Sequence, residues 1–178
     1  MILLDSGVME GKCDACGIAI ILSVEGRKME EGRFLDDFKS GEIFRTEGIT
    51  ITESEIIGFA MRYDPQAFHM DVTAASKSPY GGLIASGFHT LSVCFRLFIQ
   101  KGVIAACSIG SPGIDEVRWL APVRPGDTLR TEAEVLEIKP SSSKPDRGIL
   151  RLRYAGINQR EEKVISFILN HLLLRKTV

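Results

Sequence analysis

An aspartate and a histidine lie five residues apart in the segment Arg62–His69, RYDPQAFH, and Gly87 follows at the head of a long apolar stretch. Adding water to an activated double bond requires a base, an acid and a donor that holds the charge developing on oxygen. Asp64 and His69 flank a turn stiffened by Pro65 and are the candidates for the proton transfers. The N–H of Gly87 is the candidate donor, because N–H groups at a helix N-terminus lack intrahelical partners.

Each of these residues also has a structural explanation. Asp64 before a proline is typical of a turn, His69 could be a satisfied core histidine or a cap, and Gly87 could mark close packing of a helix on a sheet. The three residues together favour the chemical interpretation. We expect His89 to be a pocket or interface histidine rather than the base, and Asp71 to be an N-cap.

The composition is that of a globular protein, with 178 residues, 44% hydrophobic and 25% charged, and a formal net charge of −1. This length favours one domain with enough apolar material for a core. Without a basic excess, nucleic acid is not an expected partner. No segment reaches the ~20 apolar residues of a membrane span, so we expect no membrane partner either.

The cysteines indicate a reducing compartment. Cys13 and Cys16 form a lone C-x-x-C, whereas a zinc site normally needs a second pair or matching histidines. We therefore expect two reduced thiols and no metal site. Cys94 and Cys107 lie in apolar surroundings and are expected in the core. Four cysteines expected to be reduced favour a cytoplasmic protein.

The sequence pattern of residues 1–28 differs from that of the rest of the chain. The apolar run 17–24 could pass for a short signal-peptide core, but acidic residues precede it where basic ones are required. Secretion is therefore not expected. Met29 begins a stretch that looks like a natural start, so we divide the chain into a tail of uncertain role, 1–28, and a domain, 29–178.

Two short helices should flank the Asp64 turn. Thr52–Glu55, TESE, is a capping box, and apolar residues follow it at helical spacing. This helix must end near Tyr63, because Pro65 disfavours the helical conformation for Asp64. Asp71 should then cap a second short helix.

The long stretch from about Ile84 to Lys101 predicts a helix that is apolar almost all round and hence buried on every side. Helices followed by alternating strands indicate the α+β class, and one apolar helix wrapped by one curved antiparallel sheet is the hot-dog fold. The expected strands are 42–46, 113–120, 128–138, 149–157 and 164–174.

The sequence resembles the MaoC-like dehydratases, the family of (R)-specific enoyl-CoA hydratases, over about residues 33–175. The family pattern is Asp-x-Asn-Pro-aliphatic-His-x-Asp, an alanine-containing helix, a Gly-Gly or Gly-Pro break, and a His-Gly pair that opens the central helix. The matching residues are Asp64, His69, Asp71, Ala74, Ala75, Gly81, Gly82 and Gly87, and Pro122–Leu129 resembles the strand turn of that family.

The chain departs from the pattern at three places. Gln66 and Ala67 replace the Asn-Pro pair, Ser86 replaces the histidine before the glycine, and Phe95 stands where the family often has a helical serine. The candidate catalytic pair is kept, whereas the residues expected to line the pocket differ from the family pattern. The sequence therefore does not identify the acyl group of the substrate.

The resemblance implies reversible syn hydration of a trans-2-enoyl-CoA to a (R)-3-hydroxyacyl-CoA, with Asp64 and His69 contacting one water. We assign Gly87, Gly82 and Phe88 to the oxyanion and substrate-binding group. The resemblance implies no cofactor beyond the coenzyme A thioester substrate, and a homodimer or dimer of dimers with sites at the subunit boundary. An acyl-CoA thioesterase or a non-catalytic acyl-binding module stays an alternative, because one fold hosts several functions.

Four further residues carry weaker expectations. Trp119 should bury its ring in the sheet, and His171, which alternates with apolar residues, should be structural. Lys144 and Arg147 in the polar loop 140–147 could meet the phosphates of coenzyme A or simply be solvated.

Overall fold

The computed structural model describes residues 8–12, 19–23 and 32–176, and the chain divides into two compact units, 1–31 and 32–178. In the first unit, β1 (Val8–Lys12) pairs with β2 (Ala19–Ser23) in antiparallel fashion. Cys13 and Cys16 lie outside the described residues, so the expectation of reduced thiols stays a prediction. The division into a tail, 1–28, and a domain also stays a prediction.

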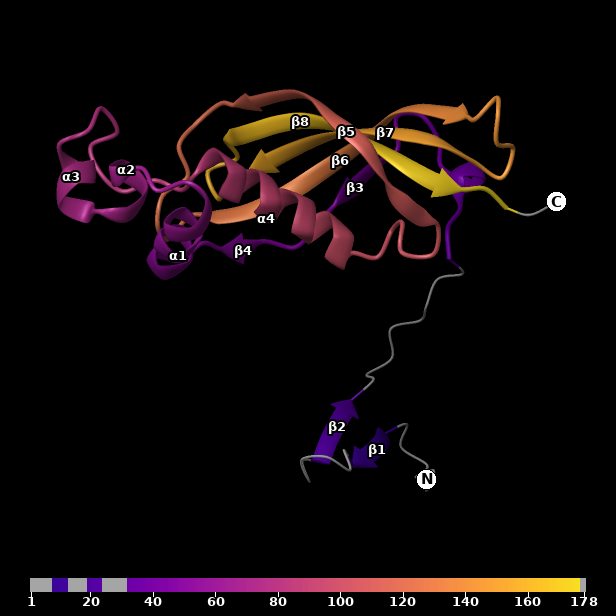
Figure 1. Cartoon of the computed structure of the whole chain (residues 1–178), viewed down its shortest axis with the longest axis horizontal. Coiled ribbons are helices and arrows are strands. Elements are labelled where there is room, and N and C mark those ends of the chain that lie inside the picture. The colour runs from indigo at the N-terminus through magenta and orange to yellow at the C-terminus, as the bar shows by residue number, and fades with distance from the viewer. Residues whose placement is uncertain (1–7, 13–18, 24–31, 177–178) are drawn as a thin grey trace. The chain divides into compact units, whose positions relative to one another are not determined.

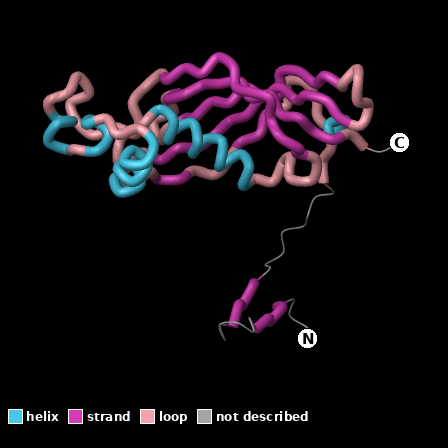
Figure 2. Tube along the Cα trace, viewed as in Figure 1, coloured by secondary structure: helices cyan, strands magenta, loops and turns pink. Residues whose placement is uncertain are grey.

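The second unit is built on one antiparallel sheet, which Figure 2 shows as a layer of long strands crossed by a helix. Its strand order is β3-β6-β7-β8-β5, and β4 also pairs with β6. Apolar side chains alternate along β6 and point toward the core, as period-2 patterning requires. The strands are β3 (Ile43–Arg45), β4 (Ile49–Thr50), β5 (Ser108–Trp119), β6 (Thr128–Pro140), β7 (Arg147–Ile157) and β8 (Lys163–Leu174).

Helix α4 (Gly87–Gln100) lies against β6 and β7 of this sheet, as Figure 1 shows. The close approach depends on Gly156 of β7, where an added Cβ would lie 2.5 Å from the Cys94 sulfur. Cys94 and Cys107 are buried free thiols, which confirms their place in the core, and burial raises both pKa values to about 11.

The prediction that this helix is buried on every side was wrong. Phe88 is 60% exposed and Ile99 is also exposed, because a single sheet covers only one face of the helix. The helix also begins at Gly87 rather than Ile84. Ile84 and Ala85 precede the helix, and their N–H groups donate to the carbonyls of Phe68 and Val123.

The small helices gather at one end of the sheet (Figure 1). Helix α1 (Glu53–Tyr63) has the predicted capping box at Thr52, and Asp71 caps α3 (Val72–Ser76) as predicted. Helix α2 (Ala67–Met70) was not predicted, because its four residues are too short to carry a periodic pattern. A further 3₁₀ turn, η1 (Leu35–Asp37), packs on β7.

The predicted α+β class is confirmed, with one helix lying across one antiparallel sheet. The prediction that Trp119 buries its ring in the sheet was wrong, since the residue is 52% exposed. Trp119 is the last residue of β5, which is an edge strand, so no strand in the described part of the chain covers its outer side.

Candidate active site

Asp64 is held at the end of α1 by the conformation that its sequence requires. Its N–H donates to the Ala60 carbonyl at 3.0 Å as the helix C-cap, and its own carbonyl accepts from Gln66 N–H at 2.7 Å. Pro65 prevents the helix from continuing. The Asp64 carboxylate, 17% exposed, therefore projects from a fixed turn.

His69 on α2 faces this carboxylate from the other side of the turn. Its ring is buried, and Nδ1 lies 2.8 Å from the carbonyl oxygen of Ile84. Because a carbonyl oxygen can only accept, Nδ1 must carry the proton in the neutral ring. Nε2 is left with its lone pair, 3.4 Å from Oδ2 of Asp64.

Two side chains donate to the Asp64 carboxylate. The Ser86 hydroxyl donates to Oδ2 at 2.6 Å, and the Gln66 amide donates to Oδ1 at 2.8 Å. The hydrogen bond from Ser86 is the main reason that the pKa of Asp64 lies below its ordinary value, with smaller contributions from Gln66 and His69 against the opposing effect of burial. Asp64 is therefore a carboxylate at neutral pH.

The two facing groups of this pair can share one water molecule. Oδ2 of Asp64 and the unprotonated Nε2 of His69 are both acceptors, so they do not bond to one another. A water that donates one hydrogen to each satisfies both groups and presents its oxygen lone pairs outward. That is the geometry for attack on an electrophilic carbon.

The pair opens into a cavity of about 540 Å³, a size ordinary for small-molecule sites. The cavity reaches from the turn of α1 and α2 to the end of β5 and the segment that follows it. Its walls are mainly apolar and aromatic. The lining residues are Asp64, Gln66, Phe68, His69, Tyr80, Ile84, Ala85, Gly87, Phe88, Thr90, Trp119, Leu120, Ala121, Pro122 and Val123.

Gly87 is the first residue of α4, and its N–H faces no acceptor among the described residues. The alternative explanation of this glycine, close packing, is also supported. An added Cβ would lie 2.3 Å from Nε1 of Trp119, so the indole occupies the space that any side chain at Gly87 would need. Phe88 contacts the same ring edge-to-face, with centroids 5.7 Å apart.

The structure thus brings Asp64, His69, Gly87 and Phe88 to one cavity. Gly82 is not among the lining residues. It lies beside Arg124 instead, where a Cβ added to Gly82 would be 3.3 Å from a guanidinium nitrogen.

His89 also lies away from the cavity lining. It stacks on Phe59 of α1 at a centroid distance of 4.8 Å, and burial lowers its pKa. The loop with Lys144 and Arg147 lies at the other end of the sheet (Figure 1), where Arg147 pairs with Asp146.

Sequence reasoning missed three residues of this site. Ser86 and Gln66 were seen only as departures from the family pattern, yet both hold the Asp64 carboxylate. A small hydroxyl residue directly before a helix is an N-cap signal, and Ser86 does accept from the Phe88 N–H. Trp119 carried no signal, because strand periodicity does not show which strand is the edge.

Among the described residues, no group of histidine, cysteine and carboxylate side chains is placed to hold a metal ion. Within the same part of the chain, no helix is long and apolar enough to cross a membrane.

Comparison with known proteins identifies the family of this chain. A family model described as "MaoC like domain" matches residues 37–151, which include Asp64, His69, Gly87 and Trp119. The chain belongs to the MaoC-like dehydratase family. Its helix and sheet are those of the hot-dog fold, as expected from the sequence.

Three relatives of this MaoC-like chain illustrate the range of the family. YdeM of Bacillus subtilis, an uncharacterized protein, is 36% identical over 141 residues, which are 79% of this chain and 99% of YdeM. Mesaconyl-CoA hydratase of Cereibacter sphaeroides is 33% identical over 144 residues, 79% of this chain but only 41% of the relative. The crystal structure of a MaoC-like dehydratase from Rhodospirillum rubrum superposes with a TM-score of 0.76 at 38% identity, covering 83% of this chain and 100% of that one.

Proposed function

We propose that this protein is an acyl-CoA hydratase/dehydratase, which adds water reversibly and in syn fashion to a trans-2-enoyl-CoA to give a (R)-3-hydroxyacyl-CoA. The observation that carries the proposal is the separation of 3.4 Å between His69 Nε2 and Asp64 Oδ2, two acceptors facing one position on a cavity wall. The N–H of Gly87 lies in the same cavity without an acceptor among the described residues, which supports the proposal. The family and the hydratase among its relatives support the same class of reaction.

In this mechanism His69 moves the proton and Asp64 orients the water. Water donates one hydrogen to Nε2 and one to Oδ2. As its oxygen bonds to C3, the first proton passes to Nε2, and the electrons of the C2=C3 bond move toward the thioester oxygen near Gly87. Nε2–H then returns that proton to C2 from the same side, and the second hydrogen stays on the new hydroxyl. The sum is one water added to one face.

The lowered pKa of Asp64 supports this division of roles. A carboxylate whose charged form is stabilised by Ser86 and Gln66 is a weak base near neutral pH. It is well suited to accept a hydrogen bond from water and to stabilise the imidazolium that forms on His69. The hydrogen bond from Nδ1 to the Ile84 carbonyl keeps the ring in the required orientation throughout.

The lining of the cavity favours an uncharged acyl group. No lysine or arginine occurs among the described residues that line it, so a second carboxylate on the acyl chain would lack a partner there. We therefore propose a monocarboxylic enoyl-CoA as the substrate, in contrast to the dicarboxylic acyl group named in mesaconyl-CoA hydratase.

The test is incubation of the pure protein with crotonyl-CoA, following the conjugated absorbance and free thiol in parallel. Loss of absorbance without thiol is the expected result. The variants D64N and H69Q should each lower kcat by at least about 100-fold, whereas D71N, which keeps a good N-cap outside the cavity, should not. Release of free thiol identifies a thioesterase instead, and no turnover with any chain length points to a non-catalytic acyl-binding module.

We also propose that the chain forms a homodimer, or a dimer of dimers, through β5. Among the described residues this strand pairs only with β8, and it is exposed along most of its length, with Ile109 and Ile114 on its surface. An exposed edge strand is a template for pairing with another strand, and a second copy supplies a matching one. The buried free thiols, Cys94 and Cys107, support a reducing, cytoplasmic location.

A further inference from the structure

We propose that the indole N–H of Trp119 is a second donor to the thioester oxygen of the substrate, beside the N–H of Gly87. The inference rests on the proposed function, because it takes the ligand of the cavity to be an acyl-CoA. It assigns a catalytic contact to a residue that sequence reasoning had placed inside the sheet.

The nitrogen end of the indole lies over Gly87, with the face of the ring toward the glycine and the N–H in the ring plane beside it. A Cβ on Gly87 would lie 2.3 Å from Nε1, 2.4 Å from Cε2 and 2.8 Å from Cδ1 of Trp119. Since a carbon–carbon bond is about 1.5 Å long, Nε1 lies within about 4 Å of the Gly87 Cα. Two N–H groups, one from the backbone and one from a side chain, therefore lie side by side in the cavity wall.

The indole N–H is free to donate. No hydrogen bond joins Nε1 to an acceptor among the described residues, and the half-exposed ring leaves this N–H accessible to a ligand in the cavity. Trp donates only, so the group that completes it must be an acceptor. A thioester oxygen with growing negative charge is such an acceptor.

Other cavity donors are less suitable. The hydroxyl of Thr90 already donates to the Ser86 carbonyl at 3.2 Å. The Tyr80 ring packs against Phe68 at a tilt of 51°, with centroids 5.3 Å apart. Phe88, by contrast, contacts the Trp119 ring edge-to-face and helps to fix its orientation. Trp119 is thus the side chain whose donor is both unused and adjacent to the proposed oxyanion position.

The composition allows a sharp test, because the chain contains one tryptophan. Expression in a tryptophan auxotroph supplied with β-(3-benzothienyl)alanine replaces the N–H at position 119 alone by a sulfur of similar shape. This substitution retains the ring packing and removes only the donor. We expect kcat with crotonyl-CoA to fall about 100-fold, a loss typical of one oxyanion donor, and the thermal midpoint to stay unchanged. The genetic variant W119F should show a similar fall in kcat.

A spectroscopic measurement separates donation from packing. Bound 4-dimethylaminocinnamoyl-CoA absorbs at longer wavelength when donors polarise its carbonyl. The natural protein should show this red shift, and the benzothienyl protein should show a smaller one. If both proteins show equal shifts and equal turnover, the assignment of Trp119 is wrong while the hydratase proposal stands. If the natural protein turns over no enoyl-CoA, the hydratase proposal fails. In that case a red shift that depends on Trp119 still supports the contact, and the absence of any shift overturns it.

Discussion

The hydroxyl of Ser86 donates to the carboxylate of Asp64 at 2.6 Å, although the two residues belong to different elements. The same oxygen of Ser86 accepts from the Phe88 N–H at 3.2 Å and caps α4. One buried side chain thus connects the end of α1 to the start of the central helix. Because the start of that helix carries Gly87, Ser86 fixes the carboxylate relative to the proposed oxyanion position.

We predict that S86A raises the pKa of Asp64 and lowers kcat about 10-fold with little change in KM. The hydrogen bond stabilises the charged carboxylate, so its removal makes protonation easier. Loss of the cap should also cost about 1 kcal/mol of stability. The Asp64 pKa is measured by carbon NMR of labelled aspartate carboxyls, with D64N to assign the signal.

The matched control is S92A, on the same helix, whose exposed hydroxyl donates to the Phe88 carbonyl at 2.8 Å. It should leave both the Asp64 signal and kcat unchanged. An Asp64 signal that titrates identically in S86A and the natural protein would contradict the role given to Ser86.

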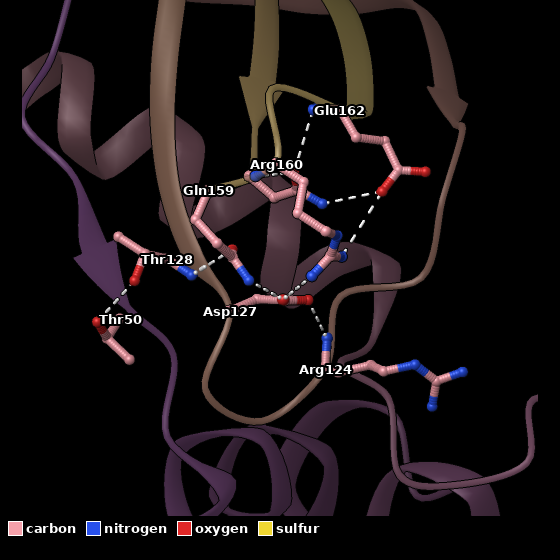
Figure 3. Close-up of polar contacts among 8 residues, drawn as sticks. Thr50, Arg124, Asp127, Thr128, Gln159, Arg160 and Glu162 are labelled. Carbon is pink, nitrogen blue, oxygen red and sulfur yellow. Dashed lines mark hydrogen bonds and ion pairs between the residues drawn. The ribbon is translucent and has the colours of Figure 1, made fainter.

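A second polar centre fixes the turn that forms the far wall of the cavity. Figure 3 shows Asp127 accepting from the Arg124 N–H at 2.8 Å, from the Gln159 amide at 2.7 Å and from Arg160 at 3.1 Å. Burial alone raises the pKa of Asp127, but these hydrogen bonds lower it overall. Within the same turn, the Val123 carbonyl accepts from the Ala85 N–H at 2.8 Å, next to Ser86.

We predict that D127N lowers the free energy of unfolding by about 2–3 kcal/mol at pH 7. The substitution removes a buried charge from hydrogen bonds that are each worth about 1.5–3 kcal/mol, and it turns an amide NH₂ toward one of the former donors. R160A should cost less than about 1 kcal/mol, since its side chain is 56% exposed. Urea unfolding measures both, and equal losses in the two variants would exclude this explanation.

The sequence predicted the helices and strands around this site better than it predicted which of their side chains are exposed. The capping box at Thr52 and the cap at Asp71 are local signals, and both are found in the structure. Exposure of Trp119 depends on the strand order β7-β8-β5, which arises from pairing between distant segments. No local pattern reports that order, so the ring was placed inside the sheet.

The partners of Asp64 show the same limit. The spacing of Asp64 and His69 was sufficient to propose a pair, because both lie on one short turn. Ser86 is 22 residues from Asp64 in sequence, and its contact depends on how α4 docks on the sheet. A hydroxyl that stands one residue before Gly87 could be recognised as a cap, but its hydrogen bond to the carboxylate required the fold.

The edge strand β5 gives a prediction for assembly. Ile114 is an exposed apolar residue on this strand, and lysine is a residue that natural edge strands use to prevent pairing. We predict that the natural protein elutes as a dimer or larger species and that I114K shifts it to a monomer, measured by size-exclusion chromatography with light scattering. K163A, a change on the neighbouring strand β8, serves as the control. A natural protein that is monomeric at all concentrations would exclude the dimer.

A buried histidine far from the cavity should control acid stability. Nε2 of His171 lies 2.7 Å from the Tyr154 hydroxyl, and both residues are buried between α4 and the sheet. Burial lowers the pKa of His171 to about 4 from its ordinary value of 6.5, and it raises the pKa of Tyr154. The neutral ring and the tyrosine hydroxyl share one buried hydrogen bond, which supports the structural role expected for His171.

The sign of the pH effect follows from this shift. Between about pH 6.5 and 4 the unfolded chain binds a proton at His171 that the folded chain does not, so the free energy of unfolding falls as the pH falls. At pH 5 this residue should account for a loss of about 2 kcal/mol relative to pH 7.5. The glutamine of H171Q can still hydrogen-bond Tyr154 but does not titrate. The free energy of unfolding of this variant should therefore fall by about 2 kcal/mol less than that of the natural protein between pH 7.5 and pH 5. Urea unfolding of both proteins at the two pH values measures these losses. Subtracting one loss from the other cancels the contributions of all other titrating groups. Equal losses in the two proteins would show that His171 is protonated in the folded state.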